Sequence, residues 1–146
     1  IIDLMPSFSD LSPEQQAQAI YMPPNYQFFV PSDFTYRSMQ ESGDFRLLRN
    51  AEIKKSILKL DRRHKDIAEI QKNYLQAMDD GYIPLMMNSF DIATMTVTDP
   101  ALLQDQLFRN FFVYTRQDTD NMVALYGLAR SQSEELLELI GEELAE

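Results

Sequence analysis

Two lengthwise stripes of apolar side chains constrain this sequence to a helical fold. The first recurs at alternating spacings of four and three residues, at Ile53, Ile57, Leu60, His64, Ile67, Gln71, Tyr74 and Met78. The second has mostly the same spacing, at Met122, Tyr126, Ala129, Ser133, Leu136, Ile140 and Leu144. Such spacing marks the side of a helix that packs lengthwise on another helix. We therefore predict an all-α fold of two long antiparallel helices, flanked by shorter helices and an irregular, Pro-rich N-terminal segment.

The pairing of the two stripes is predicted from their apolar positions and from charge. Matching the apolar residues puts Ile53 opposite Leu144 and Ile57 opposite Ile140. An antiparallel arrangement also puts the basic residues of 54–65 beside the glutamates of 134–143, which a parallel one would not. Each exposed ion pair contributes only about 0.2–1 kcal/mol, so charge would select the orientation while apolar burial supplies the stability. Ala68 and Leu75 are expected to widen the first stripe.

Capping residues and prolines in the sequence predict where the shorter helices begin and end. Ser12 followed by Pro13 predicts a helix to about Met22, after which the apolar residues of 26–30 are expected to lie extended across the core. Ser32 or Asp33 is expected to cap a helix through Glu41, and Gly43 suits a left-handed helix end.

The long helices also have recognisable ends. Asn50 is expected to cap the first, with a kink near Gly81 and Pro84 and a continuation to about Asn88. Asp99 and Pro100 predict a helix start, followed by a helix face formed by Leu103, Leu107, Phe111 and Tyr114. Residues 116–121 contain no Gly or Pro, so the sequence leaves open whether residues 100–146 form one helix or two.

Composition limits the classes of function. The chain has 146 residues and a net charge of −10, which disfavours nucleic acid as a partner because phosphate binding needs a basic surface. No run of 18 apolar residues is present in the sequence given. The absence of cysteine excludes thiol catalysis and fits an oxidising compartment. We expect residues 1–33 to pack as an irregular segment on a helical-hairpin domain of residues 34–146.

His64 is the single histidine and lies on the first stripe. It is a candidate pH sensor or ligand contact, although a polar residue that fixes helix register is the commoner role for such a position. Asp61 precedes it by three residues, but a di-iron site in a bundle needs such a pair on each of two helices, and no second histidine exists. No nucleophile elbow or phosphate-binding glycine loop is present. We therefore expect no catalytic, cofactor-binding or metal-binding residues.

Phe111 and Phe112 are the second candidate site. Adjacent residues of a helix point to different faces, so at least one of these rings must meet another element or a partner. Core packing is the default for such rings, and a surface for a protein partner or a second copy is the alternative.

Several segments resemble an uncharacterised Bacteroidetes family. The first runs from Tyr36 to Ile53 with Met39, Ser42-Gly43, Phe45-Arg46-Leu47-Leu48 and Asn50 at fixed spacing. Tyr82-Ile83-Pro84-Leu85, Asn88, Asp99-Pro100, Phe108-Arg109-Asn110 and the end from Glu134 to Leu144 are similar to its later parts. Family members carry one N-terminal membrane helix followed by an extracytoplasmic helical domain and have no established activity. The resemblance covers most of residues 34–146 and implies a periplasmic domain anchored to the inner membrane by a segment that precedes Ile1.

These observations lead to one leading expectation and two alternatives. We expect a non-catalytic extracytoplasmic helical domain of a membrane-anchored protein, acting as a protein-interaction or sensory module. The first alternative is a soluble adaptor or scaffold subunit. The second is a small-molecule-binding domain, or an unrecognised hydrolase, with a site between the N-terminal aromatic segment and the hairpin.

Overall fold

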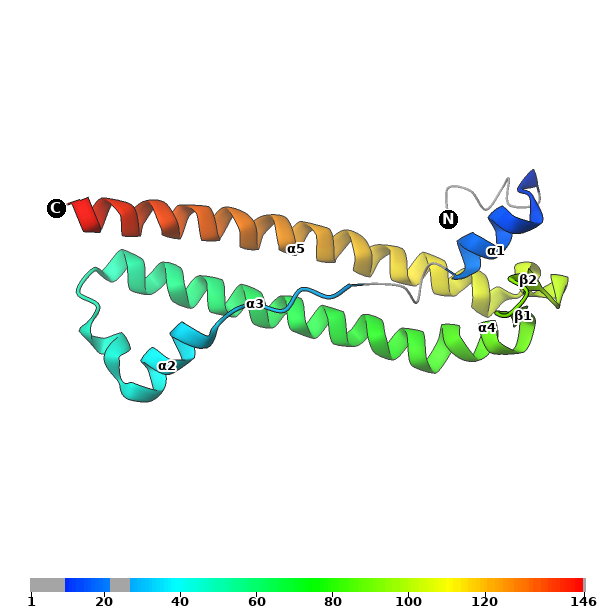
Figure 1. Ribbon diagram of the computed structural model, residues 1–146, viewed down its shortest axis with the longest axis horizontal. Coiled ribbons are helices and arrows are strands. Elements are labelled where there is room, and N and C mark those ends of the chain that lie inside the picture. The colour runs from blue at the N-terminus through cyan, green and yellow to red at the C-terminus, as the bar shows by residue number, and fades with distance from the viewer. Residues whose placement is uncertain (1–9, 22–26, 146) are drawn as a thin grey trace. The chain divides into compact units, whose positions relative to one another are not determined.

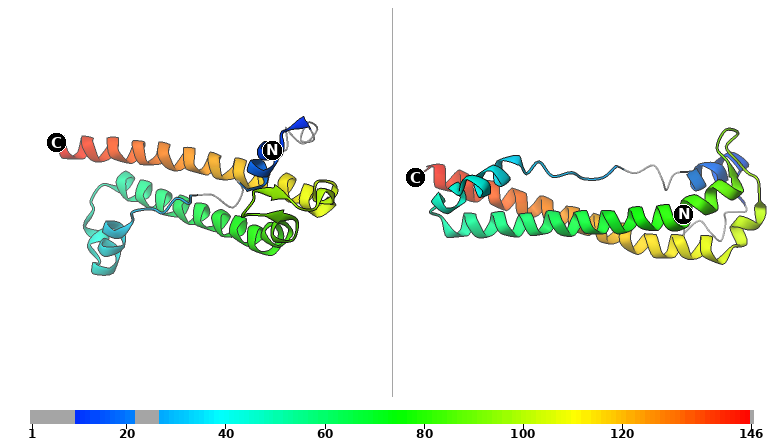
Figure 2. Two further views of the ribbon diagram at one scale, coloured as in Figure 1. Left: turned by 45° about the vertical axis from the view of Figure 1, so that its right-hand side comes forward. Right: turned by 90° about the horizontal axis from the view of Figure 1, so that it is seen from below.

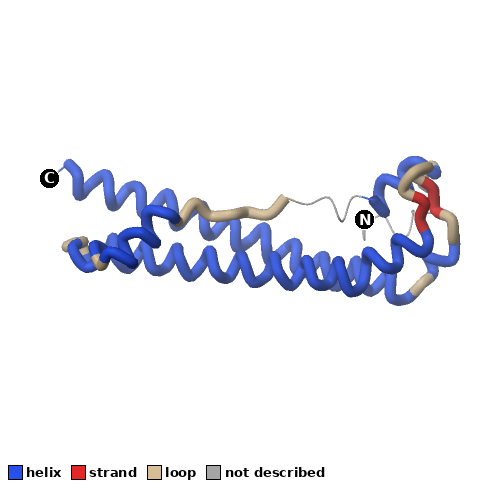
Figure 3. The backbone as a smooth tube through the Cα atoms, turned by 60° about the horizontal axis from the view of Figure 1, so that its bottom comes forward, coloured by secondary structure: helices blue, strands red, loops and turns tan. Residues whose placement is uncertain are grey.

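A computed structural model describes residues 10–21 and 27–145, and the predicted all-α class is confirmed (Figures 1 and 3). The helices are α1 (Pro13–Tyr21), α2 (Phe34–Ser42), α3 (Ala51–Ala77), α4 (Ile83–Ser89) and α5 (Gln106–Ala145). Shorter turns are the 3₁₀ helices η2 (Asp44–Leu47) and η4 (Pro100–Gln104) and the π-helical η3 (Met78–Tyr82). Strands β1 (Phe90–Asp91) and β2 (Thr96–Val97) pair antiparallel, with Phe90 opposite Val97.

The chain forms two compact units, and both long helices run through both of them. Unit 1 contains residues 1–28 and 71–120, and unit 2 contains residues 29–70 and 121–146. The expected division into residues 1–33 and residues 34–146 stays a prediction, and α3 and α5 each contribute to both units. The contact between α1 and β2 lies in unit 1, and the contact between α2 and η2 lies in unit 2.

Unit 1 contains the capped helix α1 and the helical turn η3. In α1, Ser12 Oγ accepts a hydrogen bond from the Gln15 N–H, and Gln15 Oε1 accepts one from the Ser12 N–H, which is a reciprocal capping box. Ala17 and Ile20 of α1 are buried. The predicted kink near Gly81 is confirmed as η3, where a wider helical turn connects α3 to α4, and α4 ends at Ser89.

Unit 2 contains residues 51–70 of α3 and residues 121–145 of α5 as antiparallel neighbours (Figures 1 and 2). The predicted Asn50 cap is confirmed, since its Oδ1 accepts hydrogen bonds from the Glu52 and Ile53 N–H groups at 3.0 and 3.2 Å. Asn50 Nδ2 also donates to Glu143 Oε2 at 2.6 Å, which joins the start of α3 to the end of α5. Gly43 ends α2 with a φ of 81°, as the sequence predicted.

The predicted register of the hairpin is wrong by about one turn. Leu144 is 82% exposed, so it does not cover the buried Ile53. The bond between Asn50 and Glu143 instead places Ile53 near the level of Ile140. The predicted cross-hairpin ion pairs are also absent among the described residues: each ion pair of α3 or α5 joins side chains three or four positions apart in one helix.

The predicted cap at Asp99 is confirmed, since its Oδ1 accepts a hydrogen bond from the Ala101 N–H, but the helix that it starts is the short η4. Residues 106–145 form one continuous helix, α5, and Asp105 Oδ1 accepts from the Phe108 N–H at its start.

Three further expectations need correction. Ala68 is exposed and does not widen the stripe. Leu107 and Tyr114 are exposed, so the buried face of early α5 is formed by Phe108, Phe111, Phe112 and Thr115. Val30 is exposed, so the extended stretch does not lie wholly across the core, and its Tyr26 and the expected helix end at Met22 lie outside the described residues.

Candidate functional site

His64 belongs to an aromatic cluster in unit 2. The extended segment before α2 places the Phe29 ring 5.5 Å from the His64 ring and 6.0 Å from the Tyr126 ring of α5, between ring centroids. His64 is half-buried, and the negative charges that act on it are those of the Asp61 and Asp33 carboxylates. The first of these already accepts a hydrogen bond from Lys65 Nζ at 2.7 Å. The cluster therefore connects three segments of unit 2 through one titratable ring.

Burial of His64 makes this cluster sensitive to pH. Removal of the ring from water lowers its pKa from the ordinary 6.5, and the opposing attraction of Asp61 and Asp33 is smaller. The unfolded chain therefore binds a proton more readily than the folded chain, so stability falls as the pH drops below about 6.5 toward the lower pKa of the folded state.

We expect the variant His64→Gln to lose less stability on acidification than the natural chain. Urea unfolding followed by circular dichroism at about pH 7.5 and about pH 5.5 measures this difference. The carboxylates common to both proteins act as the internal control. An equal loss in both proteins would contradict a neutral, desolvated His64.

Phe111 and Phe112 fill the core of unit 1 and do not form an exposed surface. Both side chains are buried, because the Tyr82 ring lies against each of them, at centroid distances of 4.6 and 5.6 Å. Phe108 completes the group at 5.0 Å from Phe112. Phe111 and Phe112 therefore pack in the core, which was the default interpretation of this pair. Because both rings are buried, they do not offer a surface to a partner.

Tyr82 is the residue that sequence reasoning missed. It is fully buried, and its hydroxyl donates a hydrogen bond to the backbone carbonyl of Ile20 in α1. Burial raises the pKa of Tyr82 strongly, so the phenol stays protonated and remains a donor. The position inside η3 explains the omission, because a π-helical turn shifts the side chains out of the regular helical spacing.

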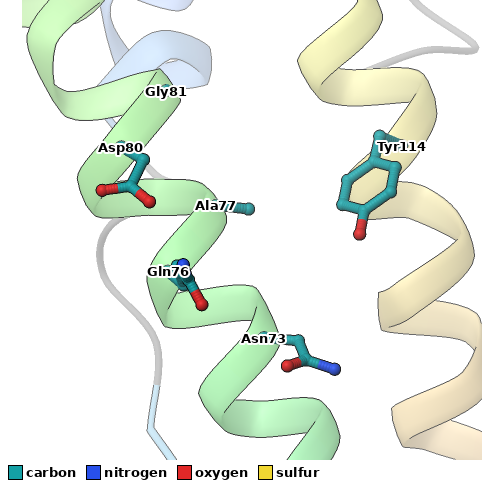
Figure 4. A pocket seen from close by; sticks show the side chains of 6 residues that line it. All are labelled: Asn73, Gln76, Ala77, Asp80, Gly81 and Tyr114. Atoms are coloured by element: carbon teal, nitrogen blue, oxygen red, sulfur yellow. The ribbon is translucent and has the colours of Figure 1, made fainter.

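A polar groove runs along η3 in unit 1 (Figure 4). Its volume is about 530 Å³, and its lining residues are Asn73, Gln76, Ala77, Asp80, Gly81 and Tyr114. Asn73 and Ala77 point toward the α5 segment that carries Tyr114 (Figure 4). An amide, a carboxylate and a phenol can hydrogen-bond a polar ligand, but these lining residues include no nucleophile with a neighbouring base.

A second groove lies between α1 and the β1–β2 turn, with a volume of about 640 Å³. Tyr21 and Ala17 line one side, and Thr94, Met95 and Thr96 line the other. Met95 has a φ of 53°, a left-handed conformation that is strained for a residue other than glycine. Asp91 holds the turn by accepting from the Ala93 and Thr94 N–H groups, and hydrogen bonds with Thr94 and Ala93 lower its pKa.

Unit 2 exposes a row of apolar side chains along α5. Val123, Leu137 and Leu144 are 65%, 69% and 82% exposed. Their separations of 14 and 7 residues place them on one side of the helix, with the exposed Arg130 between the first two. We call these three residues the apolar row. Single exposed leucines are ordinary, whereas exposed apolar side chains that share one side of a helix form a larger accessible apolar surface.

In ranges 10–21 and 27–145, no three histidine, aspartate or glutamate side chains converge so as to hold a metal ion. Over the same ranges, no helix has the length and hydropathy needed to cross a membrane.

Comparison with known proteins gave no match: no family model, no curated protein and no solved structure corresponds to this chain.

Proposed function

We propose that this chain is a non-catalytic helical module that binds another protein. The apolar row of Val123, Leu137 and Leu144 supports this proposal most directly. Amphipathic helices are recognised by partners through apolar residues at helical spacing, which this row supplies on an accessible side of α5. The pH-sensitive cluster at His64 gives the same unit a means of sensing its surroundings.

The test is site-specific photo-crosslinking in the cells that make the protein. A photoreactive amino acid at position 137 should form a light-dependent adduct with another polypeptide. Gln117, an exposed polar residue of the same helix, provides the matched control position. Absence of an adduct at 137, or equal adducts at 137 and 117, would contradict the proposal.

The proposed location is extracytoplasmic, with the chain anchored to the inner membrane. Its support is the resemblance of residues 34–146 to the family with that topology. Protease added to intact spheroplasts should then digest the protein, while a cytoplasmic marker survives. Protection of both would contradict the proposed location and would favour the soluble adaptor or scaffold.

Small-molecule binding is the second candidate function. The groove between α1 and the β1–β2 turn favours it, because a strained Met95 lines an opening of about 640 Å³. The substitution Met95→Gly relaxes the backbone strain and removes the side chain from this groove. Ligand-induced stabilisation in a small-molecule screen should disappear in that variant if the groove is the binding site.

A further inference from the structure

The outer side of α3 in unit 2 carries a row of basic residues around a leucine. Lys55, Leu58, Arg62 and Lys65 follow each other at spacings of three, four and three, so they share one side of the helix. That side is opposite the one that buries Ile53 and Ile67, because a helix advances by about 100° per residue. The three cations are exposed, and Leu58 is 48% exposed at the centre of the row. We call these four residues the basic row.

The outer side of α5 in unit 2 carries a matching acidic row. It consists of Leu128, Ser131, Glu135, Glu138 and Glu142, at spacings of three, four, three and four. All five residues are exposed, and Leu128 is 48% exposed like its counterpart in the basic row. The buried residues Met122 and Ala129 lie on the other side of the helix.

Neither row is neutralised by the other within the chain. Among residues 10–21 and 27–145, the acidic partners of Lys55 and Lys65 are Glu52 and Asp61 of the same helix, in exposed contacts of 3.5 and 2.7 Å. Within the described part of the chain, Arg62 and the glutamates at 135, 138 and 142 form no ion pair. The charged side chains of the two rows, which the sequence predicted to pair across the hairpin, are therefore exposed, with basic residues on α3 and acidic residues on α5.

We propose that the basic row of one molecule binds the acidic row of a second copy of this chain. Opposite charges steer and orient such a contact, and the two half-exposed leucines, Leu58 and Leu128, are covered in it. Because the rows occupy opposite sides of unit 2, one molecule binds one copy through each row. The contact is therefore heterologous and extends beyond a dimer. This inference goes beyond the proposed function, since the two charged rows share no residue with the apolar row on α5.

The proposal is tested with the full chain by analytical ultracentrifugation. At low salt, the average mass should rise with concentration past twice the 17.0 kDa of one chain. At about 1 M salt, where the Debye length is about 3 Å, the chain should return to a monomer.

Two charge-reversed variants make the test specific. Lys55→Glu with Arg62→Glu removes the basic row, and Glu138→Lys with Glu142→Lys removes the acidic row. Each variant alone should be monomeric at low salt, because its two rows carry like charges. An equimolar mixture should associate again, because every contact between the two different variants joins opposite charges. Both variants remain net acidic, since each double reversal changes the net charge of −10 by only four. General attraction between the variants therefore does not explain the recovery.

The control is Arg49→Glu with Arg109→Glu, which lowers the net charge by the same amount as the basic-row variant, at exposed positions outside both rows. It should associate like the natural chain, and circular dichroism should show native helix content in every variant. A natural chain that stays monomeric at low salt, a mixture that does not recover, or a control that dissociates would overturn the proposal. The photo-crosslink at position 137 probes the apolar row alone, so its result decides the proposed function separately.

Discussion

Replacing Tyr82 with alanine is expected to lower the free energy of unfolding by about 3–5 kcal/mol, the usual cost of deleting a buried aromatic side chain. Tyr82 is fully buried against Phe108, Phe111 and Phe112 in unit 1. The surrounding rings come from one helix and cannot close completely on the cavity, so the lost contacts are not recovered. Urea unfolding followed by circular dichroism measures the change.

The matched control for this prediction is Tyr82→Phe. It keeps the ring contacts and removes only the hydroxyl, so the buried carbonyl of Ile20 loses its donor. We expect a smaller loss, about 1–3 kcal/mol. If the alanine and phenylalanine variants were equally stable, the aromatic packing would not be the main support of unit 1.

Replacing Ile67 with alanine is expected to cost about 2–5 kcal/mol. Ile67 lies at the middle of the first stripe and is 1% exposed in unit 2. Leu58→Ala is the control on the same helix, because Leu58 is half-exposed and its loss should cost less than about 1 kcal/mol. Both are measured by urea unfolding at high dilution. Equal losses would show that the stripe does not face the interior of unit 2.

The periodic stripes and the caps could be predicted because both depend on local physics. Helical spacing alone places Ile53, Ile67 and Met78 on one side, and all three are buried. Asn50 and Gly43 act within four residues of their own position, so the sequence around each is enough to predict its role.

The register of the hairpin could not be predicted, because several alignments bring apolar residues together. A shift of one turn still matches large side chains, and only the polar contact of Asn50 with Glu143 distinguishes them. The charge pattern led to a wrong prediction of ion pairs between the two helices. Exposed ion pairs are weak and form most easily three or four residues apart in one helix, as Lys65 does with Asp61.

The candidate sites were harder to predict for two physical reasons. The π-helical η3 breaks the regular spacing, so the burial of Tyr82 and the groove beside Asp80 have no periodic signal. The β1–β2 turn is too short for a strand pattern, although the β-branched residues around Thr96 and Val97 were an available sign. The rings of Phe111 and Phe112 both reach the core because Tyr82 fits against each of them.

The antiparallel arrangement of α3 and α5 in unit 2 is the claim on which the two outer rows depend, and one crosslink tests it directly. The chain contains no cysteine, so Asn50→Cys with Glu143→Cys introduces a unique pair where the native side chains meet at 2.6 Å. A short bismaleimide should join this pair within one chain. It should not join Asn50→Cys to Gln132→Cys, which lies eleven residues, or roughly 16 Å, along the helix. A crosslink in the second pair and none in the first would contradict the arrangement.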